Sequence, residues 1–216
     1  MSGPPVRITE IFHSIQGESS RAGLPCVFVR LTGCSLRCTY CDTQYSYFGG
    51  EEMSVGDVVT RVSRYETPLV EVTGGEPLEQ DAVYPLMERL MAAGHTVMLE
   101  TGGHVSVANV PAPVIKVIDV KTPDSGEPET FLLENLELAA PHDEFKFVIS
   151  TRNDYEWSRD FFRRHLAHSG QVVLFSPAHG TLPNLDLAKW ILEDRLGVRM
   201  QLQLHKHIWH PNTTGV

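Results

Sequence analysis

The sequence predicts a single α/β domain over residues 1–216, an incomplete βα barrel with about six to seven mainly parallel strands. Short runs rich in β-branched and aromatic residues alternate with amphipathic helical patterns, which indicates parallel βαβ units. A complete eight-stranded barrel typically needs about 250 residues, so this length favours a partial, open barrel. Nearly every expected strand also ends in polar or glycine residues, as in folds that bind ligands at the carboxyl ends of their strands. Periodicity alone leaves a doubly wound sheet possible.

The expected strands are apolar runs bounded by turn residues. They cover residues 26–31, 69–72, 96–100, 114–120, 145–149, 172–175 and 200–204. Helices are expected between them. Ser54 opens the first, with Asp57 three residues later in a capping pattern, and valines up to residue 62 form its apolar face. A second helix over 83–91 is stopped by Gly94, and helices at 154–168 and 185–196 follow.

The composition limits the kinds of molecule that the protein is expected to bind. The chain carries 18 Lys and Arg against 27 Asp and Glu, a formal net charge of −9, which argues against broad binding to nucleic acid or an anionic membrane. No apolar run approaches the about 20 residues of a membrane span, and the amino terminus does not resemble a signal peptide. We therefore expect a cytoplasmic protein whose clustered cysteines serve a metal or catalysis.

The polar strand ends are expected to converge on one rim of the barrel. They are Gly33 with Cys34, Thr73 to Glu76, Glu100 to Gly103, Asp119 with Lys121, Ser150 with Thr151, Ser176 with Pro177, and His205 with Lys206. Loops are polar in most proteins, but seven such ends in succession indicate a ligand site.

Three of the four cysteines follow the first expected strand at a C-x₃-C-x₂-C spacing: Cys34, Cys38 and Cys41. A zinc site normally has four protein ligands, and His13 or His104 could supply the fourth. A [4Fe–4S] cluster usually takes four cysteines, so three would leave one iron for a non-protein ligand. Spacing alone leaves both sites open. Cys26 lies inside the strand and is expected to be a small buried apolar residue.

The three-cysteine motif resembles that of the radical S-adenosylmethionine superfamily. The resemblance implies that the open iron binds the amino and carboxylate groups of S-adenosylmethionine, and that the reduced cluster cleaves it to a hydrogen-abstracting 5′-deoxyadenosyl radical. Residues 73–77 read TGGEP, similar to the element that binds the amino group, where glycines allow close backbone approach. The implied cofactor contacts are Tyr40, Cys41, Asp42, Gly75, Glu76, Asp119, Val120, Lys121, Ser176 and Pro177.

Residues 10–45 closely resemble the 7-carboxy-7-deazaguanine synthase family, and the resemblance extends through VTGGEP, LETGG, DVKTPDSG, FKFVIS, LFSP and QLHKHIW. It covers most of the chain. It implies a carbon–nitrogen lyase that contracts the ring of 6-carboxy-5,6,7,8-tetrahydropterin to 7-carboxy-7-deazaguanine with loss of ammonia, in queuosine and other 7-deazapurine biosynthesis. It also implies dependence on Mg²⁺, a homodimer, and an electron donor of the flavodoxin or ferredoxin type.

The same resemblance implies the substrate contacts, and their chemistry suits a pterin. They are Ile15, Gln16, Gly17, Glu18, Arg30, Thr73 and His205. Glu18 can accept from the N–H groups of the pyrimidine edge. Arg30 lies in an apolar strand, where an unpaired guanidinium would be costly, so it needs the substrate carboxylate or a nearby glutamate. Thr43 matches the family's Mg²⁺ position, and the substrate carboxylate must complete that site because Mg²⁺ prefers several oxygen ligands.

Some positions depart from the family pattern: Ser19 where GEG is usual, Ser35 where Asn is common, Gly102 where ETNG is usual, and a tail in which an Arg often precedes the final Gly-Val. Three alternative functions remain. A glycyl-radical-enzyme activase would not need the pterin-binding QGE element, an electron-transfer iron–sulfur protein would want four protein ligands, and a zinc-binding module would be colourless.

Overall fold

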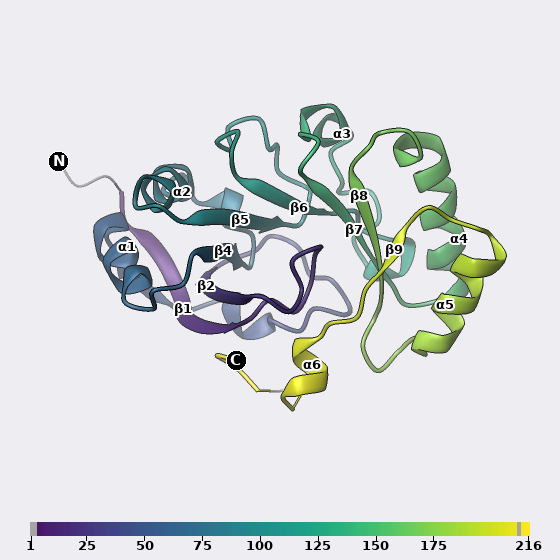
Figure 1. The fold of residues 1–216 in the computed structure, drawn as a ribbon, viewed down its shortest axis with the longest axis horizontal. Helices are drawn as coiled ribbons and strands as arrows, with labels where there is room; N and C mark the ends of the chain where they lie inside the picture. Colours follow the sequence, from purple (N-terminus) through teal and green to yellow (C-terminus); the bar gives the residue numbers. More distant parts are fainter. Residues whose placement is uncertain (1–3, 211–212) are drawn as a thin grey trace.

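The fold is one curved sheet of nine strands with helices along one of its faces (Figure 1). The computed structural model describes residues 4–210 and 213–216. The strands follow the order β3-β1-β2-β4-β5-β6-β7-β8-β9, and the two end strands do not pair with each other. The prediction of an open, partial barrel is therefore confirmed.

The elements alternate along the chain as expected. The strands are β1 (Val6–Ile15), β2 (Pro25–Leu31), β3 (Glu51–Met53), β4 (Leu69–Gly74), β5 (Thr96–Thr101), β6 (Ile115–Asp119), β7 (Glu144–Ile149), β8 (Val172–Pro177) and β9 (Arg199–Met200). The α-helices are α1 (Val55–Ser63), α2 (Val83–Ala92), α3 (Glu134–Leu138), α4 (Arg152–Phe161), α5 (Asn184–Glu193) and α6 (His205–Ile208). A π-helical turn, Phe162–Leu166, extends α4.

Seven strands, β2 and β4 to β9, run parallel, which confirms the predicted parallel core. The count of six to seven strands in total was too low because β1 and β3 add an antiparallel edge. A register shift between Ile8 and Glu10 breaks the alternation of apolar residues in β1, which hides the strand in the sequence. The expected strand at 200–204 is also wrong: β9 ends at Met200, and the chain then leaves the sheet.

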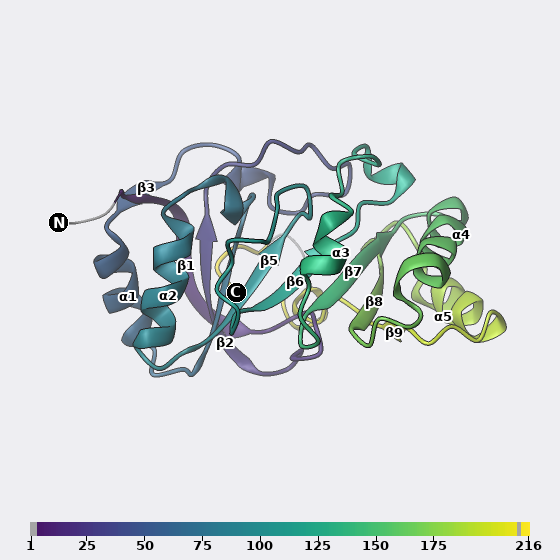
Figure 2. The same ribbon diagram turned by 90° about the horizontal axis from the view of Figure 1, so that it is seen from above.

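Two of the predicted helix signals are confirmed in detail. The side chain of Ser54 accepts a hydrogen bond from the backbone N–H of Asp57 at 3.1 Å and caps α1. Gly94 follows α2 with a φ of +94°, a left-handed conformation that ends the helix. Figure 2 shows the helices α1, α2 and α3 lying over the sheet. Among the described residues, no helix has the length and apolar character needed to span a membrane.

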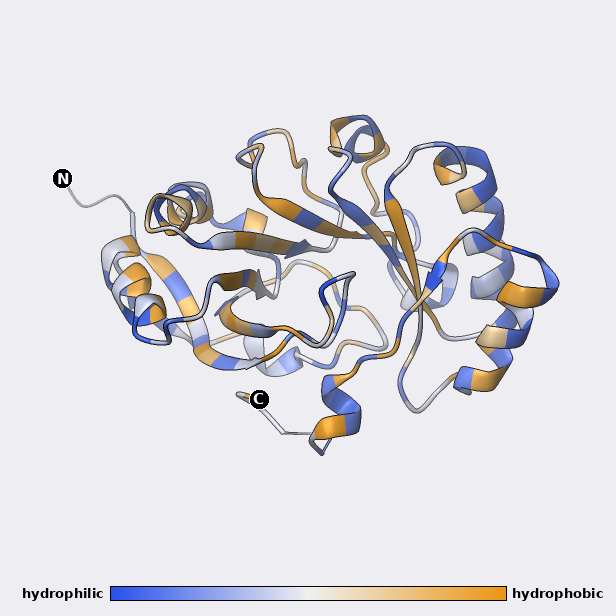
Figure 3. Cartoon of the chain, in the orientation of Figure 1, coloured by the Kyte–Doolittle hydropathy of each residue, from blue (hydrophilic) through white to orange (hydrophobic). Residues whose placement is uncertain are grey.

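The two faces of the sheet differ in chemistry. The face under the helices is apolar, with Val29, Val72, Leu99 and Phe147 in the main core (Figure 3). Side chains on the opposite, inner face are apolar near the amino ends of the strands, where they form a floor: Cys26, Phe28, Leu69, Met98, Ile115, Val117 and Leu174. Towards the carboxyl ends the inner face becomes charged. Arg30 lies beside Thr73 of the neighbouring strand there, and Asp119 lies beside Lys146. This layer positions the site.

Candidate active site at the carboxyl ends of the strands

The cysteine motif lies in the loop after β2, which leads to the 3₁₀ helix Gln44–Ser46. Its members are three free, half-buried thiols: Cys34, Cys38 and Cys41. The loop is tied to the segment after β6, because the backbone N–H of Thr39 donates to the carbonyl of Ser125 at 2.8 Å and that of Arg37 to the Glu127 carboxylate at 2.7 Å. Within residues 4–210 and 213–216, no three His, Cys, Asp or Glu side chains form a group that could hold one metal ion. Three cysteines on one loop can hold three irons of a [4Fe–4S] cluster, whereas a structural zinc site needs a fourth protein ligand.

The two histidines considered as a fourth zinc ligand have other partners. The Nε2 atom of His13 lies 2.9 Å from the hydroxyl of Thr67, and Nε2 of His104 lies 3.1 Å from the carboxylate of Glu79. The buried Cys26 is part of the apolar floor, as expected. These contacts favour the iron–sulfur interpretation.

The TGGEP loop after β4 packs directly on the cysteine loop. A Cβ atom on Gly75 would lie 1.8 Å from the carbonyl oxygen of Gly33 and 3.0 Å from Cβ of Cys34, so only glycine allows this approach. The backbone N–H of Glu76 donates to the same carbonyl at 2.7 Å. The two loops that the resemblance assigns to the cofactor and the cluster are therefore in contact.

The carboxylate of Glu76 links β4 to β5. It is fully buried and accepts from the Thr101 hydroxyl at 2.9 Å, from the Gly102 N–H at 2.7 Å, and from the Leu78 N–H at 3.0 Å. Burial raises its pKa despite these donors. Because the side chain is engaged in this way, the backbone carbonyls of the loop are better placed than the carboxylate to meet an ammonium group.

Lys146, on β7, is the centre of the charged layer. Its ammonium donates to Glu18 at 2.8 Å, bonds Glu100, and lies 3.4 Å from a carboxylate oxygen of Asp119. Burial alone would lower its pKa, but the three carboxylates outweigh burial and raise the pKa well above its usual value. The same ion pair holds the pKa of Glu18 below its usual range, although burial acts in the opposite direction. Lys146 is thus a permanent cation among carboxylates.

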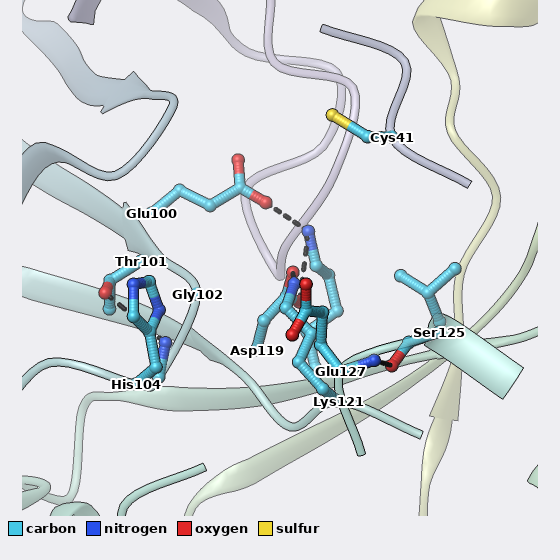
Figure 4. Close-up of polar contacts among 12 residues, drawn as sticks. Cys41, Glu100, Thr101, Gly102, His104, Asp119, Lys121, Ser125 and Glu127 are labelled. Carbon is cyan, nitrogen blue, oxygen red and sulfur yellow. Dashed lines mark hydrogen bonds and ion pairs between the residues drawn. The ribbon is translucent and has the colours of Figure 1, made fainter. Parts of the chain in front are cut away.

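A second buried lysine extends this layer towards the cysteines. The ammonium of Lys121 donates to Asp119 at 2.8 Å. Burial opposes its charge, yet the carboxylate of Asp119 raises the pKa of Lys121 above its usual value. Figure 4 shows Glu100, Asp119 and Lys121 gathered around the same space as Cys41. The predicted cofactor residues Asp119 and Lys121 therefore lie beside the cluster loop.

Gln16 fixes the loop that carries Glu18. Its amide nitrogen donates to the carboxylate of Glu71 on β4, and its amide oxygen accepts from the backbone N–H of Glu18 at 3.0 Å. Burial, reinforced by the charge of Glu100, raises the pKa of Glu71 well above its usual value. Glu71 therefore keeps its proton to a higher pH than an ordinary glutamate, and it orients Gln16 and through it Glu18.

The segment after β9 crosses the site as a strap, residues 201–206. Gln201 and Gln203 donate to the carboxylate of Glu18 at 3.2 and 2.9 Å. The imidazole of His205 packs against Gly17, where a Cβ would lie 2.1 Å from its Nδ1 atom. Lys206, next to it, pairs with the carboxylate of Asp42 on the cluster loop at 2.6 Å. The strap therefore connects the loop of Glu18 to the loop of the cysteines.

Arg30 projects from β2 on the inner face and has a glutamate as its partner. Its Nε atom donates to Glu10 at 2.8 Å, and the hydroxyl of Tyr45 donates to the same carboxylate oxygen at 2.6 Å. Phe12 and Tyr45 each lie 5.9 Å from the guanidinium carbon. Of the two partners that the sequence allowed, the nearby glutamate is confirmed. A terminal nitrogen of Arg30 also donates to the Gly74 carbonyl at 3.5 Å, and the remaining N–H groups can still bind a carboxylate.

The remaining predicted residues differ in how they face the site. The hydroxyl of Thr43 lies 3.7 Å from the sulfur of Cys41, and the buried phenol of Tyr40 has no hydrogen-bond partner among residues 4–210 and 213–216. Ile15 ends β1, and Thr73 and Ser176 lie on the inner face, Ser176 one residue before Pro177 ends β8. Val120 is different, because its side chain packs in the core beneath the helices. Only its backbone can meet a cofactor.

Lys146, Glu71 and the two strap glutamines were not predicted as site residues. A signal for the first two is present: each is a charged residue within an apolar strand, in EFKFVI and LVEV, at a position that alternation places on the inner face. The strap glutamines had no such signal, because their partner Glu18 is more than 180 residues away along the chain.

Comparisons with known proteins agree with this geometry. Residues 28–113 match the family model described as Radical SAM superfamily. A 7-carboxy-7-deazaguanine synthase of Koribacter versatilis is 50% identical over 98% of this chain and 100% of its own length, and that of Chlorobaculum tepidum is 45% identical over 98% of each chain. The crystal structure of QueE from Escherichia coli shares the fold, with a TM-score of 0.78 and 24% identity over 93% of this chain and 95% of that one. The chain belongs to the 7-carboxy-7-deazaguanine synthase family of radical S-adenosylmethionine enzymes.

Proposed function

We propose that the protein converts 6-carboxy-5,6,7,8-tetrahydropterin to 7-carboxy-7-deazaguanine with loss of ammonia, as a carbon–nitrogen lyase of queuosine and other 7-deazapurine biosynthesis. The observation that carries the proposal is the layer of carboxylates around Lys146, two of which, Glu100 and Asp119, face the same space as Cys41 of the cysteine loop (Figure 4). A charged layer of this kind suits a small polar heterocycle, whose donors and acceptors it can pair.

Cys34, Cys38 and Cys41 would hold a [4Fe–4S] cluster, and S-adenosylmethionine would complete it. The cradle of Gly75 against Gly33 and the three thiols that form no single-metal site support this assignment. When bound, the pair supplies a radical that removes hydrogen from the substrate. The chain's own residues seat the cofactor: the backbone of the loop at Gly75 and Glu76, with Tyr40, Asp42, Asp119, Val120, Lys121, Ser176 and Pro177 around it.

Glu18 and Arg30 would bind opposite ends of the pterin. The Glu18 carboxylate, ionised beside Lys146, accepts from the N–H groups of the pyrimidine edge, and the backbone of Ile15, Gln16 and Gly17 adds further partners. The free edge of Arg30 receives the substrate carboxylate. Thr73 and His205 line the space between them, and the neutral imidazole of His205, whose pKa is lowered by burial, can accept or donate one hydrogen bond.

The Mg²⁺ ion is proposed at Thr43. Its hydroxyl lies at the edge of the cluster loop, next to Asp42, whose carboxylate pairs with Lys206. One hydroxyl is a weak ligand for Mg²⁺, so the substrate carboxylate and waters would complete the coordination. The family resemblance further suggests a cytoplasmic homodimer that takes its electrons from a flavodoxin-type or ferredoxin-type donor.

Anaerobic turnover tests the proposal. Protein reconstituted with iron and sulfide is incubated with reductant, S-adenosylmethionine, Mg²⁺ and 6-carboxytetrahydropterin, and 7-carboxy-7-deazaguanine is identified by mass. Release of 5′-deoxyadenosine without this product would keep the radical chemistry and contradict the substrate. A colourless protein with tightly held zinc would contradict both.

A further inference from the structure

His104 occupies space that only a glycine at position 102 leaves open. A Cβ atom on Gly102 would lie 2.9 Å from Nδ1 of His104 and 3.2 Å from a carboxylate oxygen of Glu76. Figure 4 shows the imidazole beside Thr101 and Gly102 at the end of β5. The departure from the family pattern at Gly102 therefore has a structural counterpart in this chain: the imidazole two residues later takes the place of a side chain.

The imidazole contacts both the cysteine loop and the segment that follows β4. Its Nε2 atom lies 3.1 Å from the carboxylate of Glu79 and 3.2 Å from the hydroxyl of Ser35, the residue after Cys34. Its Nδ1 atom lies 3.6 Å from the carboxylate of Glu76. The N–H of Ser35 also donates to Glu79 at 3.0 Å. We call Ser35, Glu76, Glu79 and His104 the histidine clasp.

The clasp is not explained by folding stability alone. The His104 side chain is only 10% exposed, and Nδ1 has no hydrogen-bond partner among the described residues. A carboxylate can only accept, so Nε2 can serve Glu79 only as a donor, and Nδ1 lies 3.6 Å from a second carboxylate, that of Glu76, beyond hydrogen-bond distance. A buried polar atom without a partner costs free energy, which points to a purpose other than packing.

We propose that His104 is a positioning residue that fixes the TGGEP loop against the cysteine loop and thereby sets the seat of S-adenosylmethionine relative to the iron that binds it. The inference rests on the assignment of these loops to the cofactor and the cluster. S-adenosylmethionine must reach both loops at once, and a displacement of about 1 Å between such groups can cost about a hundredfold in rate. Gly102 is required chiefly because His104 is present, since the imidazole makes the shortest of the contacts that a Cβ there would meet.

A double-mutant cycle tests the proposal. Wild type, His104→Ala, Gly102→Ala and the double variant are reconstituted, and the Kd of S-adenosylmethionine is measured by anaerobic calorimetry. Each single variant is expected to bind about tenfold more weakly, the scale of one or two lost hydrogen bonds. The double variant is expected to lose no more than about tenfold, because the alanine then meets no imidazole. His95→Ala is the matched control, since His95 is a half-buried histidine that bonds the Thr67 carbonyl at the opposite end of β5.

Spectroscopy of the cluster distinguishes a positioning role of His104 from general damage to the cluster or the fold. The iron content and the electron paramagnetic resonance spectrum of the reduced cluster should match wild type in His104→Ala, whereas the spectral change on adding S-adenosylmethionine should require more cofactor. Wild-type affinity in His104→Ala, or a hundredfold loss in the double variant, overturns the proposal. If His104→Ala loses its iron, His104→Gln must recover it while binding stays weak, and equal iron loss in both variants also overturns it.

These measurements contain no pterin, so they stand apart from the proposed reaction. Wild type that makes no deazaguanine but shows the expected cycle would contradict the substrate and keep the role of His104. Normal turnover with identical cofactor affinity in all four proteins would keep the proposed reaction and contradict the role of His104.

Discussion

The ammonium of Lys146 lies 2.8 Å from the carboxylate of Glu18, a residue 128 positions earlier in the chain. This pair joins β7 to the loop after β1, and Glu100 and Asp119 meet the same ammonium from the strands between them. One ammonium group thus contacts three carboxylates at the point where the substrate is expected to bind, and Lys121 pairs with one of them, Asp119. Removing that cation leaves the carboxylates buried and close together, which is costly.

Lys146→Met should therefore lose both stability and substrate binding. We expect a drop of about 3–5 kcal/mol in the free energy of unfolding and a loss of pterin affinity, measured by urea denaturation and calorimetry. Lys116→Met is the matched control, because Lys116 pairs with Asp143 at 2.7 Å, equally buried, on the helix-covered face. It should lose similar stability and keep its affinity for the pterin in its folded fraction. Equal affinity in both variants would contradict the role given to Lys146.

Glu71→Gln should change how stability depends on pH. The pKa of Glu71 is raised in the folded protein, so between its ordinary value of 4.5 and the higher folded value the folded state keeps a proton that the unfolded state has released. Stability contributed by this group is therefore lost as pH rises through that window, by about 1.4 kcal/mol per pH unit. Glutamine cannot ionise and can still accept from Gln16. The variant should gain melting temperature over wild type as pH rises above 4.5, and a constant difference at every pH would refute the raised pKa.

Much of the fold could be read from the sequence because local pattern and global structure agree there. The apolar runs of β4 and β6 and the capping pair Ser54 and Asp57 each act through near neighbours. The early end of β9 could not be predicted. The chain leaves the sheet after β9 because the side chains of Gln201 and Gln203 donate hydrogen bonds to the distant Glu18.

The candidate site, like the fold, could be predicted where it depends on local motifs and not where it depends on distant contacts. The cysteines and TGGEP are contiguous motifs, so the sequence alone could place them in loops that follow two strands. The roles of Lys146 and Glu71 depend on register between strands that are distant in sequence, so alternation could suggest an inward direction but not their partners. His104 lay outside any motif, because its importance comes from the missing side chain at Gly102.

Arg30→Lys should weaken binding of the pterin without unfolding the protein. A lysine can keep the charge near Glu10, 2.8 Å away from Arg30 in the wild type, but it lacks the planar fork that binds a carboxylate through two N–H groups. We expect KM for the pterin to rise about tenfold or more, the equivalent of at least ~1.4 kcal/mol, in steady-state assays. Arg7→Lys is the control, since Arg7 forms an exposed pair with Glu52 that should contribute at most about 1 kcal/mol. An unchanged KM in Arg30→Lys would remove Arg30 from the substrate site.

Gly17→Ala should displace the strap. The added methyl would lie 2.1 Å from Nδ1 of His205, well inside van der Waals contact, so the imidazole and the adjoining turn α6 must move away from the loop of Glu18. We expect faster proteolysis after the strap and a rise in KM for the pterin, with the cluster and the binding of S-adenosylmethionine retained. Gly56→Ala is the matched control: its Cβ in α1 would approach Ser54 no closer than 3.7 Å, and alanine should stabilise that helix by about 1 kcal/mol. If Gly17→Ala binds pterin as wild type does, the strap is not part of the substrate site.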